Sequence, residues 1–192
     1  MEIGATKAVQ DRLKTTKIEE SKGASLVFCW DTHLTKIKGR NVLFIVNASN
    51  RYTIAMTDIE PRNWNYYTMY IRSVIHGVMQ EMGYSEDQIG QYFKMSGDTT
   101  VTKTHGRKSV GGINRMVMDA QYFGKKLEKE AKYQWELSEY LNRDICQPEG
   151  FDAYGYPNEL FKLDMERLGI ATKRKPAKVI DFAQYIENNR GT

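Results

Sequence analysis

Two stretches decide the fold: Ser25-Leu26-Val27-Phe28-Cys29-Trp30 and Asn41-Val42-Leu43-Phe44-Ile45-Val46-Asn47. Both are rich in β-branched and aromatic residues and are bounded by polar segments, which predicts two strands. The turn-forming residues Asn47-Ala48-Ser49-Asn50-Arg51 follow, and Tyr52-Thr53-Ile54-Ala55-Met56 resumes the strand pattern. Strands joined by such short connections indicate an antiparallel meander.

After this meander, the spacing of apolar residues along the sequence changes from a strand pattern to a helical one. Apolar residues three or four apart predict one helix over 64–82 and another over 109–141, the second continuing through Gly124. Ser85 and Gln88 form a capping-box pattern, in which a hydroxyl and an amide satisfy reciprocal backbone donors. Pro157 suits the first position of a later helix that Gly169 would end.

These patterns predict a single-domain α+β fold, and 192 residues is a usual length for one domain. We expect an antiparallel sheet, packed against the long helices. Its strands are expected near residues 2–5, 25–32, 41–47 and 52–56, joined by 98–104. Residues 1–147 are expected to form the core domain, and 148–192 a helical extension that wraps it.

Composition narrows the class of protein. The net charge of +4 is mildly basic, and no apolar run of about 18 residues could cross a membrane. The first residues carry no secretory signal, so a cytoplasmic protein is expected. Cys29 and Cys146 lie far apart without a CxxC partner, which favours free thiols. Because no carboxylates or histidines have the spacing of a metal motif, we expect neither metal nor cofactor.

Charge is distributed unevenly along the second half of the chain. Residues 103–132 hold eight basic and three acidic residues, 133–166 hold two and eight, and 167–178 hold five and none. The two basic segments could form a surface that follows a phosphate backbone, or they could be solvated faces paired with the acidic segment. The candidate nucleic-acid-binding residues are Lys103, Arg107, Lys108, Arg115, Lys125, Lys126, Lys173, Arg174 and Lys175.

His105 lies inside this basic region, in the sequence His105-Gly106-Arg107-Lys108. Neighbouring cations are expected to lower its pKa and to hold a phosphodiester beside it, the setting of a metal-independent ribonuclease with a general acid or base. The alternative is an exposed loop histidine without a role. The following Ser109-Val110-Gly111-Gly112 is expected to precede a helix, where its amides could cradle a phosphate or its glycines could simply form a turn.

Four features carry a resemblance: Ala5-Thr6-Lys7 followed by Leu13, the strand with Trp30, the strand Asn41–Asn47, and above all Arg107-Lys108-Ser109-Val110-Gly111-Gly112-Ile113-Asn114. On these residues the chain resembles a bacterial and phage domain family of unknown function. Its signature is Ser-Val-x-Gly followed shortly by Asn, and Asn114 comes one residue earlier here. The resemblance covers roughly residues 1 to 130 and implies no activity. In general character the chain is also similar to plasmid- and phage-borne anti-CRISPR proteins of Gram-positive bacteria, some of which act on the guide RNA of type II effectors.

The similarity to anti-CRISPR proteins implies a counter-defence protein of a mobile element. We expect it to engage RNA or a ribonucleoprotein, such as a type II CRISPR effector, and it could be a ribonuclease that uses His105. The alternative is a non-catalytic inhibitor or antitoxin-like module whose acidic segment, Glu136 to Glu166, meets a basic protein partner.

Overall fold

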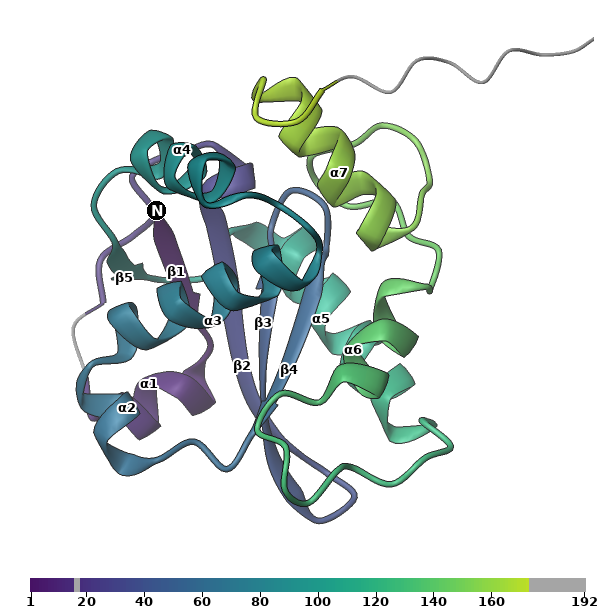
Figure 1. Ribbon diagram of the computed structural model, residues 1–192. Coiled ribbons are helices and arrows are strands. Elements are labelled where there is room, and N and C mark those ends of the chain that lie inside the picture. The colour runs from purple at the N-terminus through teal and green to yellow at the C-terminus, as the bar shows by residue number, and fades with distance from the viewer. Residues whose placement is uncertain (16–17, 173–192) are drawn as a thin grey trace, which may run out of the picture.

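The computed structural model describes residues 1–15 and 18–172, and Figure 1 shows the arrangement of its elements. One five-stranded sheet has the order β4-β3-β2-β1-β5. The strands are β1 (Glu2–Ala5), β2 (Cys29–Ile37), β3 (Arg40–Asn47), β4 (Thr53–Thr57) and β5 (Thr100–Thr102). The expected α+β class is confirmed.

The pairing of the sheet differs from the expectation at one edge. Strands β2, β3 and β4 form the predicted antiparallel meander, although the strand expected at 25–32 begins only at Cys29, because Leu26–Phe28 form a 3₁₀ helix. Strand β1 is parallel to both β2 and β5, so the sheet is mixed. The reason is the connection after β1: parallel neighbours need a crossover connection, and helix α1 (Lys7–Leu13) lies between β1 and β2 in the chain. The prediction of an antiparallel sheet is therefore wrong for β1 and β5.

The helices cover both faces of the sheet. After α1 they are α2 (Pro61–Asn65), α3 (Tyr67–Glu81), α4 (Glu86–Ser96), α5 (Gly106–Gln121), α6 (Trp135–Asn142) and α7 (Pro157–Arg167). Val9 of α1, Ile71 and Ile75 of α3, and Tyr92 of α4 share a core with Trp30. On the opposite face, α5 and α6 pack their apolar residues on Phe44 and its neighbours.

The prediction of one helix over 109–141 is wrong. Helix α5 begins earlier and ends at Gln121, and α6 begins only at Trp135. Between them the chain folds around the buried amide of Gln134, which donates to Glu128 O and Ala131 O and accepts from Glu128 N. The amide satisfies backbone groups that a continuous helix would have paired internally.

Several local predictions are confirmed. Ser85 and Gln88 form the full capping box at the start of α4. Pro157 opens α7, and Gly169, with a φ of 71°, follows its end. Phe161 of α7 lies in the main core, with its ring centroid 6.1 Å from that of Trp30.

Helix α6 covers the edge strand β4. The amide of Asn142 accepts from Thr53 N at 2.8 Å and donates to Thr53 O at 2.8 Å, as a neighbouring strand would. Further along the same edge, Ser138 Oγ accepts from Ala55 N at 3.0 Å. Because an uncovered edge is a template for pairing with other chains, these side chains close the sheet on this side.

Candidate functional site

The parallel pair β1–β2 places polar side chains inside the protein. In its register Glu2 lies beside Cys29, and Gly4 beside Asp31. Residues two apart in a strand share a face, so Glu2, Cys29 and Asp31 all lie on the face that α5 covers. Glu2 is 4% exposed, and Cys29 and Asp31 are fully buried.

Gly4 makes room for the Asp31 side chain. A Cβ atom built on Gly4 would overlap Oδ1 of Asp31 and would lie 3.0 Å from its Cγ. The carboxylate therefore occupies space that any other residue at position 4 would fill.

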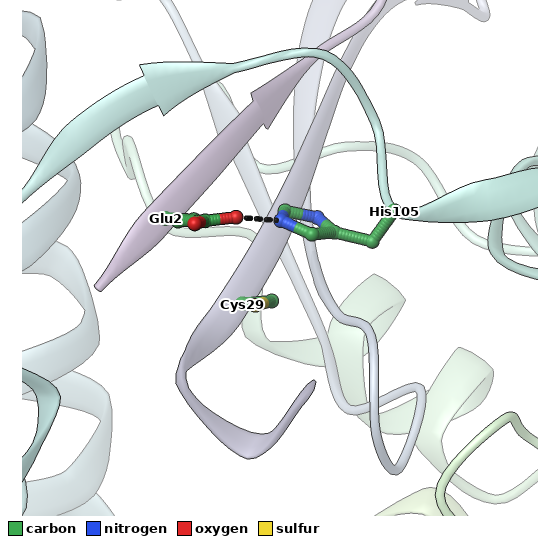
Figure 2. A group of neighbouring side chains, drawn as sticks. All are labelled: Glu2, Cys29 and His105. Atoms are coloured by element: carbon green, nitrogen blue, oxygen red, sulfur yellow. Dashed lines mark hydrogen bonds and ion pairs between the residues drawn. The ribbon is translucent and has the colours of Figure 1, made fainter. Parts of the chain in front are cut away.

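His105 joins these side chains from the turn between β5 and α5. Its Nδ1 lies 2.7 Å from Asp31 Oδ1, and its Nε2 lies 3.0 Å from Glu2 Oε2. Figure 2 shows the imidazole reaching Glu2 across the strands, with the Cys29 thiol close by. Gly106, with a φ of 88°, allows the sharp turn that sends the chain from His105 into the helix.

Asp31 ties the start of α5 to the sheet. Besides the imidazole, it accepts from the backbone N of His105 at 3.2 Å and from the Ser109 hydroxyl. A carboxylate near a helix N-terminus also has a favourable interaction with the helix dipole. Asp31 therefore lies at the helix N-terminus, where one of the two interpretations of the sequence placed an external phosphate.

The pKa of His105 is shifted in the opposite direction from the expectation. Burial by itself would lower its pKa, but the hydrogen bonds and negative charge supplied by Asp31 and Cys29 outweigh this effect and raise the pKa to about 10. The prediction that nearby cations lower this pKa is wrong, because the ring points into the protein and away from them. The pKa of Glu2 is lowered: burial opposes this, and hydrogen bonds from Ser21, Lys22 and His105 produce it.

The four residues predicted to cradle a phosphate or form a turn, Ser109, Gly111, Gly112 and Asn114, lie on α5, which begins at Gly106. The prediction of a helix start after Gly112 is therefore wrong: Ser109, Gly111 and Gly112 lie inside the helix, where their amides belong to its hydrogen-bond ladder. Gly111 and Asn114 are exposed, whereas Gly112 is half-buried and lies against Arg51.

The basic residues are exposed but spread over several segments. Arg107, Lys108 and Arg115 project from α5, and Lys126 follows the helix. Lys103 pairs with Glu20, and Lys125 with Glu136 at 2.6 Å. The predicted residues Lys173, Arg174 and Lys175 lie outside the described residues.

Sequence spacing missed the association of Glu2, Cys29 and His105. One ligand atom from each lies within 4.8 Å of the others. These residues belong to β1, to β2 and to the turn before α5, so no linear motif connects them. Chemically, the group can retain a proton between buried anions or coordinate a cation. Cys29 and His105, with Asp31, also have the composition of a nucleophile triad, but a thiol with 0% exposure does not meet a substrate in this conformation.

The structure defines an α+β protein with a histidine buried between two carboxylates. The sequence profile of a domain of unknown function, DUF6933, matches residues 2–160, so the chain belongs to that family. This confirms the expectation of a family of unknown function. No curated protein and no solved structure matches the chain. Among the described residues, no helix is both long and apolar enough to span a membrane.

Proposed function

We propose that this protein binds RNA, free or within a ribonucleoprotein, through the exposed face of α5. This basic face is one continuous strip, because its residues are spaced three or four apart along the helix. Its members are Arg107, Lys108, Gly111, Asn114, Arg115, Met118, Gln121 and Tyr122, and all are exposed.

The chemistry of the basic face carries the proposal. Arg107, Lys108 and Arg115 can contact phosphates. Lys108 also donates to Pro148 O at 3.2 Å, and Arg115 pairs with Asp119 at 3.1 Å. Gly111 has no neighbouring atom within 4 Å of an added Cβ, so a ligand can approach the helix backbone there. Tyr122 is 80% exposed and offers a ring on which an unpaired base can stack.

Single-stranded or looped RNA fits these features better than a duplex. Stacking on an exposed aromatic ring needs an unstacked base, which loops and single strands provide. A type II CRISPR effector with its guide RNA is the ribonucleoprotein to test, in keeping with the anti-CRISPR-like character of the sequence.

The proposal is one of binding. His105 is 8% exposed beneath the start of α5, and both ring nitrogens face carboxylates. Cleavage of RNA by His105 remains a prediction from the sequence, and it requires an opening that frees the ring.

The alternative, an acidic surface that meets a basic protein, has less support from the described residues. Glu136 pairs with Lys125, Glu139 pairs with Arg143 at 2.9 Å, and Asp164 is buried. Three of the eight acidic residues of residues 133–166 are therefore already paired or buried within the chain.

Binding of a labelled single-stranded RNA, measured by fluorescence anisotropy over a range of salt concentrations, tests the proposal. Replacing Arg107 and Arg115 by Ala should weaken binding and reduce the salt slope, by about 0.7 for each phosphate that the protein no longer neutralises. The matched control removes Arg62 and Lys94, which lie on α2 and α4. An RNA affinity and salt slope that both variants leave unchanged would contradict the proposal.

A further inference from the structure

We propose that Glu2, Cys29 and His105 form a binding site for one Zn²⁺ ion. The ligand atoms are a carboxylate oxygen of Glu2, Sγ of Cys29 and Nε2 of His105, which lie within 4.8 Å of one another. All three side chains are buried, and they come from three different parts of the fold (Figure 2).

The donor set matches the chemistry of zinc. Thiolate, imidazole and carboxylate are the three side-chain ligands that zinc uses, at about 2.0 to 2.3 Å from the metal. Tetrahedral coordination at such lengths separates ligand atoms by about 3 to 4 Å. The group therefore reaches coordination geometry by a small inward movement of side chains, without rearrangement of the sheet.

Asp31 provides the supporting interaction that zinc-bound histidines usually have. A histidine that binds a metal through one nitrogen generally donates the other N–H to a carboxylate, which fixes the ring orientation. Here Nδ1 of His105 lies 2.7 Å from Asp31 Oδ1, leaving Nε2 toward Glu2 at 3.0 Å. Asp31 is itself held by the Ser109 hydroxyl and the backbone N of His105.

The charges balance when the ion binds. Zn²⁺ takes the place of the proton that joins His105 Nε2 to Glu2 Oε2, and Cys29 loses its thiol proton to bind as thiolate. Both protons pass to solvent, as is usual when metals bind to protein ligands. The two negative ligands neutralise the ion, so the site gains no buried net charge.

The exposed segment Ser21-Lys22, which contacts Glu2, offers a path by which the ion can enter the site. The backbone N of Lys22 donates to Glu2 Oε1 at 2.8 Å, and Ser21 and Lys22 are exposed. Displacement of this short segment exposes the carboxylate without breaking a strand pairing of β1.

Cobalt(II) is the probe, because it occupies zinc sites and its absorption reports thiolate coordination. Titration of the full chain, after treatment with a chelator, should give a thiolate-to-cobalt charge-transfer band that saturates at one ion per chain. Zn²⁺ should then abolish the band, since nitrogen and sulfur ligands hold zinc more tightly than cobalt. Absence of the band would overturn the proposal.

Variants assign the ligands. Cys29→Ser should remove the band, whereas Cys146→Ser, which alters the other buried free cysteine, should retain it. Asp31→Asn should retain the band with about 10- to 100-fold weaker affinity, the usual cost of losing a supporting partner. Circular dichroism checks that each variant is folded; if Cys29→Ser is not, Glu2→Gln replaces it and should weaken cobalt binding. A band that persists in folded Cys29→Ser, or an affinity that Glu2→Gln leaves unchanged, would also overturn the site.

Discussion

Gly4 and Asp31 lie side by side in the parallel β1–β2 pair, and the aspartate carboxylate occupies the space where a Cβ of residue 4 would be. This close approach links the sheet to α5, because the same carboxylate holds His105 and Ser109. A glycine in a strand normally weakens it, so its presence here marks a place where another group comes near the backbone.

Gly4→Ala should destabilise the protein by about 3 kcal/mol, the upper part of the usual cost of overpacking a buried position. The added methyl group has to displace Asp31 from its partners. Gly90→Ala is the control, because nothing lies within 4 Å of its added Cβ and it sits inside α4. There the change should stabilise by roughly 0.5 to 1 kcal/mol. Chemical denaturation measures the change in the free energy of unfolding for both variants. Equal changes would contradict the close approach of Asp31 to Gly4.

His105→Leu should lower the free energy of unfolding by about 3 to 5 kcal/mol, because it leaves Glu2 and Asp31 as unpaired buried charges. His76→Leu is the matched control: this histidine also contacts a carboxylate, Glu86 at 3.0 Å, but on the surface. Exposed pairs contribute at most about 1 kcal/mol. Denaturation in the presence of chelator separates this effect from metal binding, and a small loss for His105→Leu would show that the buried ion pairs are unimportant.

Asn142→Ala should destabilise by about 2 kcal/mol, because the Thr53 N–H and carbonyl each lose their partner on the edge of β4. The unpaired backbone groups of Thr53 should also promote association between chains at this end of the edge, which size-exclusion chromatography with light scattering detects. Asn114→Ala, on the exposed face of α5, should change stability by less than about 0.5 kcal/mol. A monomeric Asn142→Ala variant of unchanged stability would contradict the role of α6 as an edge cover.

Asp164 should show a pH dependence opposite to that of a surface carboxylate in an ion pair. Burial raises its pKa, although hydrogen bonds from Asn50 and Ser49 and the charge of Arg167 oppose the shift. A carboxyl whose pKa is higher in the folded state contributes stability at pH values below its unfolded pKa, and this contribution is lost as the pH rises through the folded pKa.

Two measurements check this sign. The carboxyl carbon of Asp164, followed by NMR, should titrate above the ordinary value of 3.8, and Arg167→Ala should move the midpoint further upward. Asp164→Asn should gain stability relative to the unmodified protein as the pH rises from below 4 to neutrality. A midpoint below the ordinary value would contradict the raised pKa.

Residue patterns within short windows determined much of the fold. The β-branched run at Asn41–Asn47 predicted β3, the capping box predicted the start of α4, and Pro157 predicted the start of α7. The run at Leu26–Trp30 was predicted wholly as strand, but Leu26–Phe28 form a 3₁₀ helix and β2 begins at Cys29. The confirmed features depend on backbone geometry and on neighbours a few residues away, so they can be recognised without tertiary contacts. The α+β class follows from them, and the chain shares its family profile over residues 2–160.

The direction of β1 and the surroundings of His105 depend on contacts between distant parts of the chain. The sequence around His105 is basic, which suggested an exposed ring among cations, but the turn at Gly106 directs the imidazole inward to two carboxylates. Those carboxylates come from strands whose residues lie 74 and 103 positions away along the chain. Pairing over such separations depends on how the whole sheet assembles, so residue patterns within a short window do not predict it.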